Sequence, residues 1–287
     1  MAVALGSHLL VYHELKKKHL QCFESNGIRQ LELWLAEPHI PWRDPQELER
    51  FKNMLEEFQI TVPSVHLPFY PSVPDLINEG VKWSVIANEE QQRKIAIQGA
   101  AEGIAASSTL GAKSAVLHLG WQHDIWNDFS HGWAREAVQE LMSVANKHGV
   151  KLLLENIISE GTRIESLIRL LDEIDPEKKV GICLDLGHAN IEGEILTILS
   201  QASSRLDHIH VHDNDGKQDA HLCPGQGTIP WKNVLDFLQE KEFKGIATLE
   251  LRDYSRGLNE AEDTISQHIK MCNPFYHSWK QRFCKDT

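Results

Sequence analysis

Short apolar runs alternate with longer amphipathic segments along most of the chain. The short runs are rich in Val, Ile and Leu and are typical of buried strands, whereas the longer segments repeat apolar positions every three to four residues, which is typical of helices. The expected strands are Val3–Ser7, Gln30–Leu35, Ile60–His66, Lys113–Leu119, Val150–Asn156, Val180–Asp185, His208–His212 and Gly245–Leu251.

Helix signals mark the segments between these strands, such as Asp44 followed by Pro45 at a helix start. Eight strands separated by helices predict an α/β fold with a single (β/α)8 TIM barrel. The expected helices are Gln46–Phe58, Glu89–Leu110, Trp133–His148, Thr162–Ile174, Ile191–Ala202, Trp231–Glu240 and Asn259–Met271.

We expect the barrel to occupy residues 1–272 and residues 273–287 to form a C-terminal tail. The aromatic residues of this tail predict that it packs on the barrel or on a partner subunit of a homodimer, and the sequence does not choose between the two. Two connections, Leu67–Ala87 and Asp213–Ile229, are long, and loops of such length in a compact domain are often functional.

The composition and charge of the chain favour some classes of protein and disfavour others. Of 287 residues, 41% are hydrophobic and 24% charged, which is typical of a globular chain, and no apolar run approaches the roughly 20 residues of a membrane span. The N-terminus lacks the order of features of a signal peptide, so we expect a cytoplasmic protein. The net charge of −12 disfavours a long nucleic-acid groove. Free thiols rather than disulfides are expected for the widely spaced Cys22, Cys183, Cys223, Cys272 and Cys284.

Potential metal ligands end six consecutive strands, where the active groups of such barrels lie. Apolar residues precede each of them, and an unpaired buried charge costs several kcal/mol, so a shared partner is expected. A set of imidazoles and carboxylates without thiolates favours Zn²⁺ or Mn²⁺. The strand ends carry His66, His118, Glu155, Asp185, His210 and Glu250, and His188, Asp219 and His221 follow in the connections.

The seventh strand presents an ambiguity, because its alternation points His208, His210 and His212 to the same face. Periodicity does not say which of the three binds a metal. His208 is the deepest in the barrel and is expected to be a core residue.

From the third strand to the eighth, the motifs resemble those of the xylose isomerase-like barrel superfamily, which contains sugar isomerases and epimerases together with endonuclease IV. The resemblance covers about two thirds of the chain. The matching pieces are Ser64–Pro68, Leu117–Gly120, Leu154–Asn156, Leu184–His188, the His210-x-x-Asp213 unit, Asp219–Gly227 and Leu249-Glu250.

The resemblance implies a set of ligands for one to three divalent ions. The family histidine that precedes an acid by three positions falls on His210 rather than His212. A site with one metal, as in the sugar epimerases, corresponds to Glu155, Asp185, His210 and Glu250. The three-metal site of endonuclease IV adds His66, His118, His188, Asp219 and His221.

Departures from endonuclease IV after His118 and Asn156 favour an isomerase or epimerase that acts on a small carbohydrate or sugar phosphate. In this interpretation Glu155 and Glu250 face each other across the barrel mouth and move a proton next to a metal-bound carbonyl, while His188 stabilises the developing oxygen charge. Residues expected to bind substrate are Phe69, His212, Gly225 and Gly227.

Several alternatives remain open. Gly225 and Gly227 belong to a G-x-G that either binds phosphate or forms a plain turn before the helix that starts at Pro230. Phe69 and Tyr70 would stack on a base in an endonuclease IV-like phosphodiesterase that acts on abasic DNA, or they wall a sugar pocket. A third alternative is a metal-binding barrel without catalysis, which the intact pair of Glu155 and Glu250 disfavours.

Overall fold

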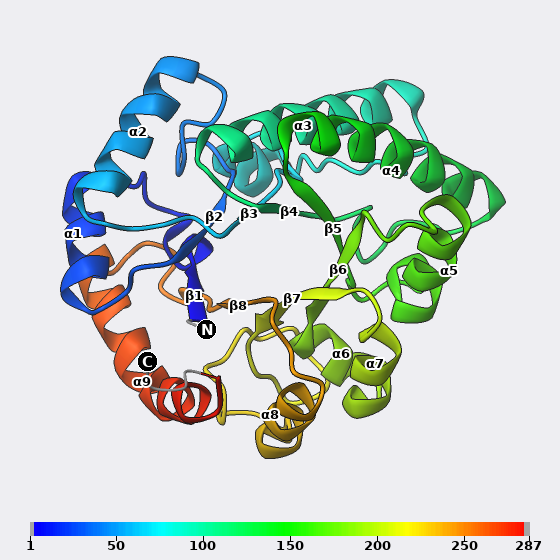
Figure 1. Ribbon diagram of the computed structural model, residues 1–287. Helices are drawn as coiled ribbons and strands as arrows, with labels where there is room; N and C mark the ends of the chain where they lie inside the picture. Colours follow the sequence, from blue (N-terminus) through cyan, green and yellow to red (C-terminus); the bar gives the residue numbers. More distant parts are fainter. Residues whose placement is uncertain (1–2, 284–287) are drawn as a thin grey trace.

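Eight parallel strands close into a barrel in chain order, with helices around the outside (Figure 1). The computed structural model describes residues 3–283, so Cys284 lies outside the described residues. The predicted fold and all eight predicted strands are confirmed. The strands are β1 (Val3–Gly6), β2 (Leu31–Trp34), β3 (Ser64–His66), β4 (Ser114–Leu117), β5 (Lys151–Glu155), β6 (Gly181–Asp185), β7 (Leu206–Val211) and β8 (Ile246–Leu249).

The helices form a ring that covers the outer face of the barrel (Figure 1). Asp44 caps α2 as its sequence predicts, because its carboxylate accepts from the backbone N–H groups of Gln46 and Glu47. The helices are α1 (Lys17–Ser25), α2 (Pro45–Glu57), α3 (Glu90–Thr109), α4 (Asp128–His148), α5 (Ile164–Ile174), α6 (Leu186–Glu192), α7 (Ile195–Ala202), α8 (Trp231–Glu240) and α9 (Ala261–Phe283), with short turns η1 (Ser7–Leu10), η2 (Asp75–Glu79) and η3 (Glu160–Thr162).

Helix bounds differ from those predicted in several places, most of all in α4, in the segment of α6 and α7, and in α9. α4 begins before the expected Trp133, because the Asn127 side chain caps the N–H groups of the first turn. The predicted helix Ile191–Ala202 is two helices, α6 and α7, which separate at Gly193 with a φ of 150°. α6 starts directly after β6, with the Asp185 carboxylate as its cap.

The C-terminal segment is part of a helix. α9 runs through residue 273, so the expected boundary between barrel and tail falls inside it. Phe275 and Trp279 are buried, and the Phe275 ring packs against Trp231 of α8 with centroids 5.2 Å apart. The expectation that every cysteine is a free thiol is wrong for Cys223 and Cys272, whose sulfur atoms are bonded between the loop after β7 and α9.

Alternation along the strands separates an apolar outer layer from a polar barrel interior. On β7, Ile209 and Val211 join the large hydrophobic core under the helices, whereas His208 and His210 point inward, and all four are fully buried. His208 contacts the Thr248 hydroxyl at 2.9 Å, as expected for a core residue. Within residues 3–283, no helix has the length and apolar character needed to cross a membrane.

Candidate metal centre and pocket

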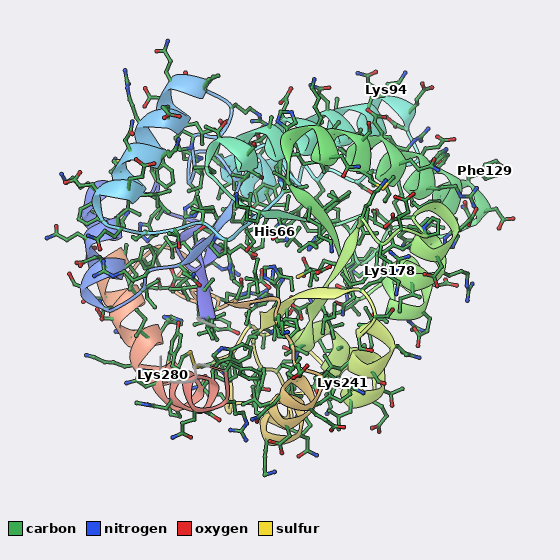
Figure 2. All side chains as sticks on the ribbon, viewed as in Figure 1. His66, Lys94, Phe129, Lys178, Lys241 and Lys280 are labelled. Atoms are coloured by element: carbon green, nitrogen blue, oxygen red, sulfur yellow. A yellow bond between two sulfur atoms is a disulfide. The ribbon has the colours of Figure 1, made fainter. Side chains whose placement is uncertain are left out.

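Candidate ligands from six strands and one loop meet near the centre of the barrel, where His66 is labelled in Figure 2. The sequence-predicted ligands fall into three groups, and within each group the candidate ligand atoms lie within 4.8 Å of one another. A fourth group of this kind is Cys183, His208 and His210. The structure therefore gathers all nine side chains that the sequence singled out. The first group is Glu155, Asp185, His210 and Glu250; the second is His66, His118 and Glu155; the third is His188, His212, Asp219 and His221.

The first group lies almost completely buried at the bottom of the barrel mouth. His210 Nδ1 lies 3.1 Å from Glu155 Oε1, 3.3 Å from Glu250 Oε2 and 3.9 Å from Asp185 Oδ2. None of the four side chains is more than 4% exposed. Glu155 and Glu250 thus converge on one point instead of facing each other across an open mouth.

Three buried carboxylates around one imidazole need a cation. Burial is the largest cause that raises the pKa of Glu250, and Glu155 and Asp185 raise it further, against the opposing effect of His210, so the carboxyl is pushed well above its ordinary value. The pKa of Glu155 is well below its ordinary value, because His210 and His118 outweigh the effect of burial. Such crowding of acids fits a divalent ion, which would satisfy all three carboxylates at once.

The second group shares Glu155 with the first. His118 Nε2 lies 2.9 Å and His66 Nε2 lies 3.2 Å from Glu155 Oε2, while Oε1 of the same carboxylate faces His210. The two oxygens therefore point into different groups. A carboxylate in this position can bridge two metal ions.

Backbone carbonyls orient three of the histidines. Nδ1 of His66 contacts the Leu67 carbonyl at 2.9 Å, Nδ1 of His188 contacts the Asn156 carbonyl at 2.8 Å, and Nδ1 of His221 contacts the Glu250 carbonyl at 2.9 Å. A carbonyl accepts only from N–H, so the proton lies on Nδ1. This leaves Nε2 of each ring directed into its group, the arrangement that metal-bound histidines typically show.

The third group joins α6, the end of β7 and the loop after β7. Asp219 Oδ2 lies 3.1 Å from His221 Nε2, and Asp219 Oδ1 lies 3.6 Å from His188 Nε2. Asp185 links this group to the first, because its Oδ1 accepts from the His188 N–H while its Oδ2 lies 2.9 Å from His212 Nε2. Both groups are consequently held by one aspartate at the start of α6.

Glu32 on β2 was missed by the sequence analysis. Its carboxylate lies 2.9 Å from His210 Nε2 and 3.2 Å from His208 Nε2, and it accepts from the Ser64 hydroxyl at 2.5 Å. His210 and His208 outweigh burial and lower the pKa of Glu32 to about 2. Glu32 therefore holds the far nitrogen of His210 and leaves Nδ1 free to face the first group. The sequence feature that could have identified Glu32 is its position as a single acidic residue between Leu31 and Leu33.

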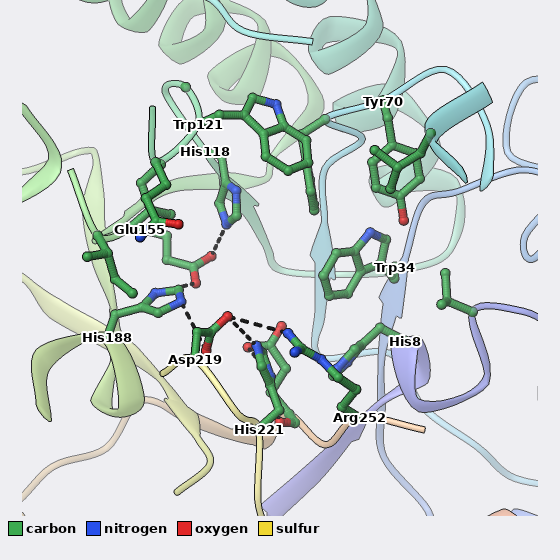
Figure 3. A pocket seen from close by; sticks show the side chains of 18 of the residues that line it. His8, Trp34, Tyr70, His118, Trp121, Glu155, His188, Asp219, His221 and Arg252 are labelled. Atoms are coloured by element: carbon green, nitrogen blue, oxygen red, sulfur yellow. Dashed lines mark hydrogen bonds and ion pairs between the residues drawn. The ribbon is translucent and has the colours of Figure 1, made fainter. Parts of the chain in front are cut away.

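A pocket of about 320 Å³ opens above the three groups (Figure 3). Aromatic rings form much of its wall: Trp34 stacks on His66 with centroids 4.5 Å apart, and Phe69 stacks on His118 at 4.6 Å. Phe69 lines the pocket, as predicted. The other lining residues include Tyr70, Trp121, Glu155, His188, Asp219, His221 and Glu250.

Three of the expected substrate-binding residues do not line the pocket, and we no longer place them there. The Gly225 N–H donates to Asp213 Oδ2 at 2.8 Å, so this amide is already satisfied. Gly227 packs so closely on the Asn214 backbone that a Cβ would lie 2.1 Å from its carbonyl oxygen. This favours the turn interpretation of the G-x-G. His212 is fully buried beside Asp185 and belongs to the third group.

Two further lining residues, His8 and Arg252, were not expected from the sequence. His8 follows β1 in η1 and Arg252 follows β8. The first and last strands are neighbours in the closed barrel, so these two side chains reach the same side of the pocket. Their position just after strand ends was the available signal.

Comparison with known proteins agrees with this architecture. Residues 21–274 match the family model described as xylose isomerase-like TIM barrel. An uncharacterized protein of Methanocaldococcus jannaschii is 26% identical over 80% of this chain and 77% of its own length. Fructoselysine 3-epimerase of Shigella flexneri is 22% identical, with 78% and 81% covered. A protein of Ureaplasma urealyticum named probable endonuclease 4 is 26% identical, with 75% and 74% covered.

Solved structures show the same fold. The IOLI protein, whose crystal structure contains a bound zinc atom, superposes with a TM-score of 0.79 at 18% identity, covering 99% of this chain and 100% of that one. This likeness confirms the barrel fold.

Proposed function

This chain belongs to the xylose isomerase-like TIM barrel family, and from that premise we propose that it is a divalent-metal-dependent isomerase or epimerase of a small carbohydrate or sugar phosphate. The observation that carries the proposal is the first ligand group. Its carboxylates Glu155 and Glu250 both line a pocket whose volume of about 320 Å³ suits a small ligand.

The proposed cofactor is Zn²⁺ or Mn²⁺, held by Glu155, Asp185, His210 and Glu250, with room for further ions in the other two groups. A bound divalent ion would polarise a substrate carbonyl and so acidify the neighbouring C–H. The donor set fits such an ion because three buried carboxylates converge on one imidazole.

The chain itself would move the proton. A carboxylate oxygen of Glu155 or Glu250 removes the proton from the substrate carbon, and the other carboxylate returns one. His188 lines the pocket with its Nδ1 held by the Asn156 carbonyl, so its Nε2 would point toward a substrate oxygen when no ion occupies the third group. This nitrogen would stabilise negative charge that develops on a substrate oxygen.

The pocket wall supports a carbohydrate ligand. Trp34, Phe69 and Trp121 present ring faces and edges that pack on the C–H groups of a sugar and help to exclude water from the reacting carbon. One relative that matches over 78% of this chain is named fructoselysine 3-epimerase, which supports an epimerase.

Solvent-deuterium exchange tests the proposal. Metal-loaded protein is incubated in D₂O with a panel of ketoses, ketose phosphates and keto acids, and loss of a C–H signal next to the carbonyl is followed by NMR. We expect exchange on at least one compound, and its loss in Glu155→Gln and Glu250→Gln. Exchange that persists in both variants would show that Glu155 and Glu250 do not move the proton.

A second candidate is a phosphodiesterase that acts on abasic DNA. The observation that favours it is the completeness of the second and third ligand groups, since clustered divalent ions suit phosphodiester hydrolysis. Incision of an oligonucleotide with one abasic site, measured with the same metal-loaded protein, separates the candidates. Incision of the oligonucleotide without proton exchange on any sugar would favour the phosphodiesterase and refute the isomerase.

A further inference from the structure

His8 presents an imidazole without a partner to the pocket. Both ring nitrogens are shielded from solvent, and within residues 3–283 neither has a hydrogen-bond partner. The ring lies between Trp34 and His221, with centroid distances of 4.7 Å and 5.5 Å. Gly6 makes room for it, because a Cβ there would lie 3.0 Å from His8 Nδ1. An unsatisfied polar group in this position is costly unless a ligand completes it.

Arg252 brings free donors to the same side of the pocket. A guanidinium has five N–H donors, and the one side-chain contact that the described structure gives it is a long 3.5 Å approach to Asp219 Oδ2. Its side chain is 45% exposed, so it can reorient toward a ligand. Figure 3 shows Arg252 and His8 together below Trp34, on the side away from Glu155.

Most carboxylate oxygens near this side already have partners. Asp253 lines the pocket, but its two oxygens accept from the N–H groups of Ser255 and Gly257, each at 2.8 Å. Asp219 Oδ2 faces His221 Nε2 at 3.1 Å, whereas Asp219 Oδ1 has no hydrogen-bond partner among the described residues.

We propose that His8 and Arg252 form an anion subsite that binds a phosphate ester or carboxylate group of the substrate. The inference rests on the proposed function, because it assumes that a carbohydrate occupies the pocket, and it narrows the substrate to an anionic carbohydrate. Arg252 supplies the charge and a planar fork of donors that matches an oxyanion. His8 would add one N–H from the same side once its ring turns to bring a nitrogen to the pocket surface. Trp34 would pack on the carbon chain.

Anion binding to the metal-loaded protein tests the subsite without any turnover. Isothermal titration calorimetry is performed with inorganic phosphate and, separately, with acetate, which distinguishes a phosphate site from a carboxylate site. Loss of one charged hydrogen bond typically costs a factor of about 10 or more in affinity. We therefore expect Arg252→Met and His8→Phe to weaken binding of the preferred anion at least about tenfold.

Two controls separate the subsite from other effects. Arg50→Met removes an exposed arginine on α2 and is expected to leave binding unchanged. His8→Gln keeps a hydrogen-bonding group and is expected to restore most of the affinity lost in His8→Phe. Circular dichroism checks that His8→Phe folds, and the half-exposed Arg252 gives the same test with little risk to the core.

The possible outcomes test the anion subsite and the isomerase activity separately. Equal anion affinity in wild type, Arg252→Met and His8→Phe would place the anion on the metal ions alone and overturn the subsite, as would absence of binding to the wild type. Deuterium exchange is scored independently. Anion binding that depends on His8 and Arg252 without any exchange supports the subsite and refutes the isomerase, whereas exchange on neutral ketoses alone supports the isomerase and refutes the subsite.

Discussion

The Nε2 atoms of His66 and His118 lie 3.3 Å apart, although the two residues belong to different strand ends. The Leu67 carbonyl accepts from Nδ1 of His66, which turns Nε2 of that ring toward the group. Both nitrogens also approach Glu155 Oε2. Two imidazoles and a carboxylate oxygen that converge on one point are arranged as ligands of a common cation.

Glu155 should be the most consequential ligand, because its two oxygens belong to different groups. We expect Glu155→Ala to lower the metal content of the purified protein more than Asp219→Ala or His66→Ala, each of which belongs to one group. Elemental analysis by mass spectrometry measures this. Glu160→Ala, on the exposed turn after β5, is the control and should retain the wild-type content. Equal losses in all three ligand variants would contradict the bridging position.

Glu32 should control metal affinity without touching the metal. It holds His210 Nε2, and loss of such an outer partner typically lowers metal affinity about 10–100-fold. We expect Glu32→Leu to fall in this range and Glu32→Gln to fall less, because an amide oxygen still accepts from Nε2. Competition with a chromophoric chelator gives the affinities. If both variants bind metal as tightly as wild type, Glu32 does not position His210.

Removal of metal should destabilise the fold. The carboxylates of Glu155, Asp185 and Glu250 are buried together. Without a cation, burial and then the neighbouring carboxylates destabilise the charged form of Glu250, which is why its pKa is raised. A ligand present at 100 times its Kd stabilises by about 2.7 kcal/mol, so chelation should lower Tm by several degrees. The drop should be smaller in Glu250→Gln, where one charge is gone. Thermal unfolding with and without EDTA checks this, and an equal drop in both proteins would contradict the explanation.

Two glycines offer a matched test of the loop after β7. An added Cβ on Gly227 would lie 2.1 Å from the Asn214 carbonyl oxygen, whereas one on Gly132 of α4 meets nothing within 4 Å. Gly227→Ala should therefore destabilise by about 1–3 kcal/mol, as overpacked sites typically do. Gly132→Ala should stabilise by up to about 1 kcal/mol through helix propensity. Urea denaturation measures both, and similar effects at the two sites would refute the packing argument.

The sequence predicted the barrel and the gathered ligands for clear physical reasons. Strand period placed Ile209 and His210 on opposite faces, and parallel strands bring their carboxyl ends to one edge, so residues at strand ends had to meet. Glu32 was missed because it lies inside a strand, one layer below the ligands. The break at Gly193 was missed because the apolar pattern continues across it.

The orientation of the histidine rings cannot be predicted from a sequence pattern. The carbonyls of Leu67, Asn156 and Glu250 decide which nitrogen of each histidine faces the group, and every residue type has a carbonyl. The same limit explains why the sequence suggested Gly225 as a substrate-binding residue. Its N–H donates to Asp213, twelve positions earlier in the chain, and no pattern reveals this contact.

The central claim is that Glu155, Asp185, His210 and Glu250 hold a divalent metal ion. Crystals of the protein reconstituted with Zn²⁺, measured on both sides of the zinc absorption edge, test it most directly. The account predicts an anomalous peak about 2.0–2.2 Å from His210 Nδ1 and from oxygens of the three carboxylates. A map without a peak among these four side chains, or with zinc bound only elsewhere, would contradict it.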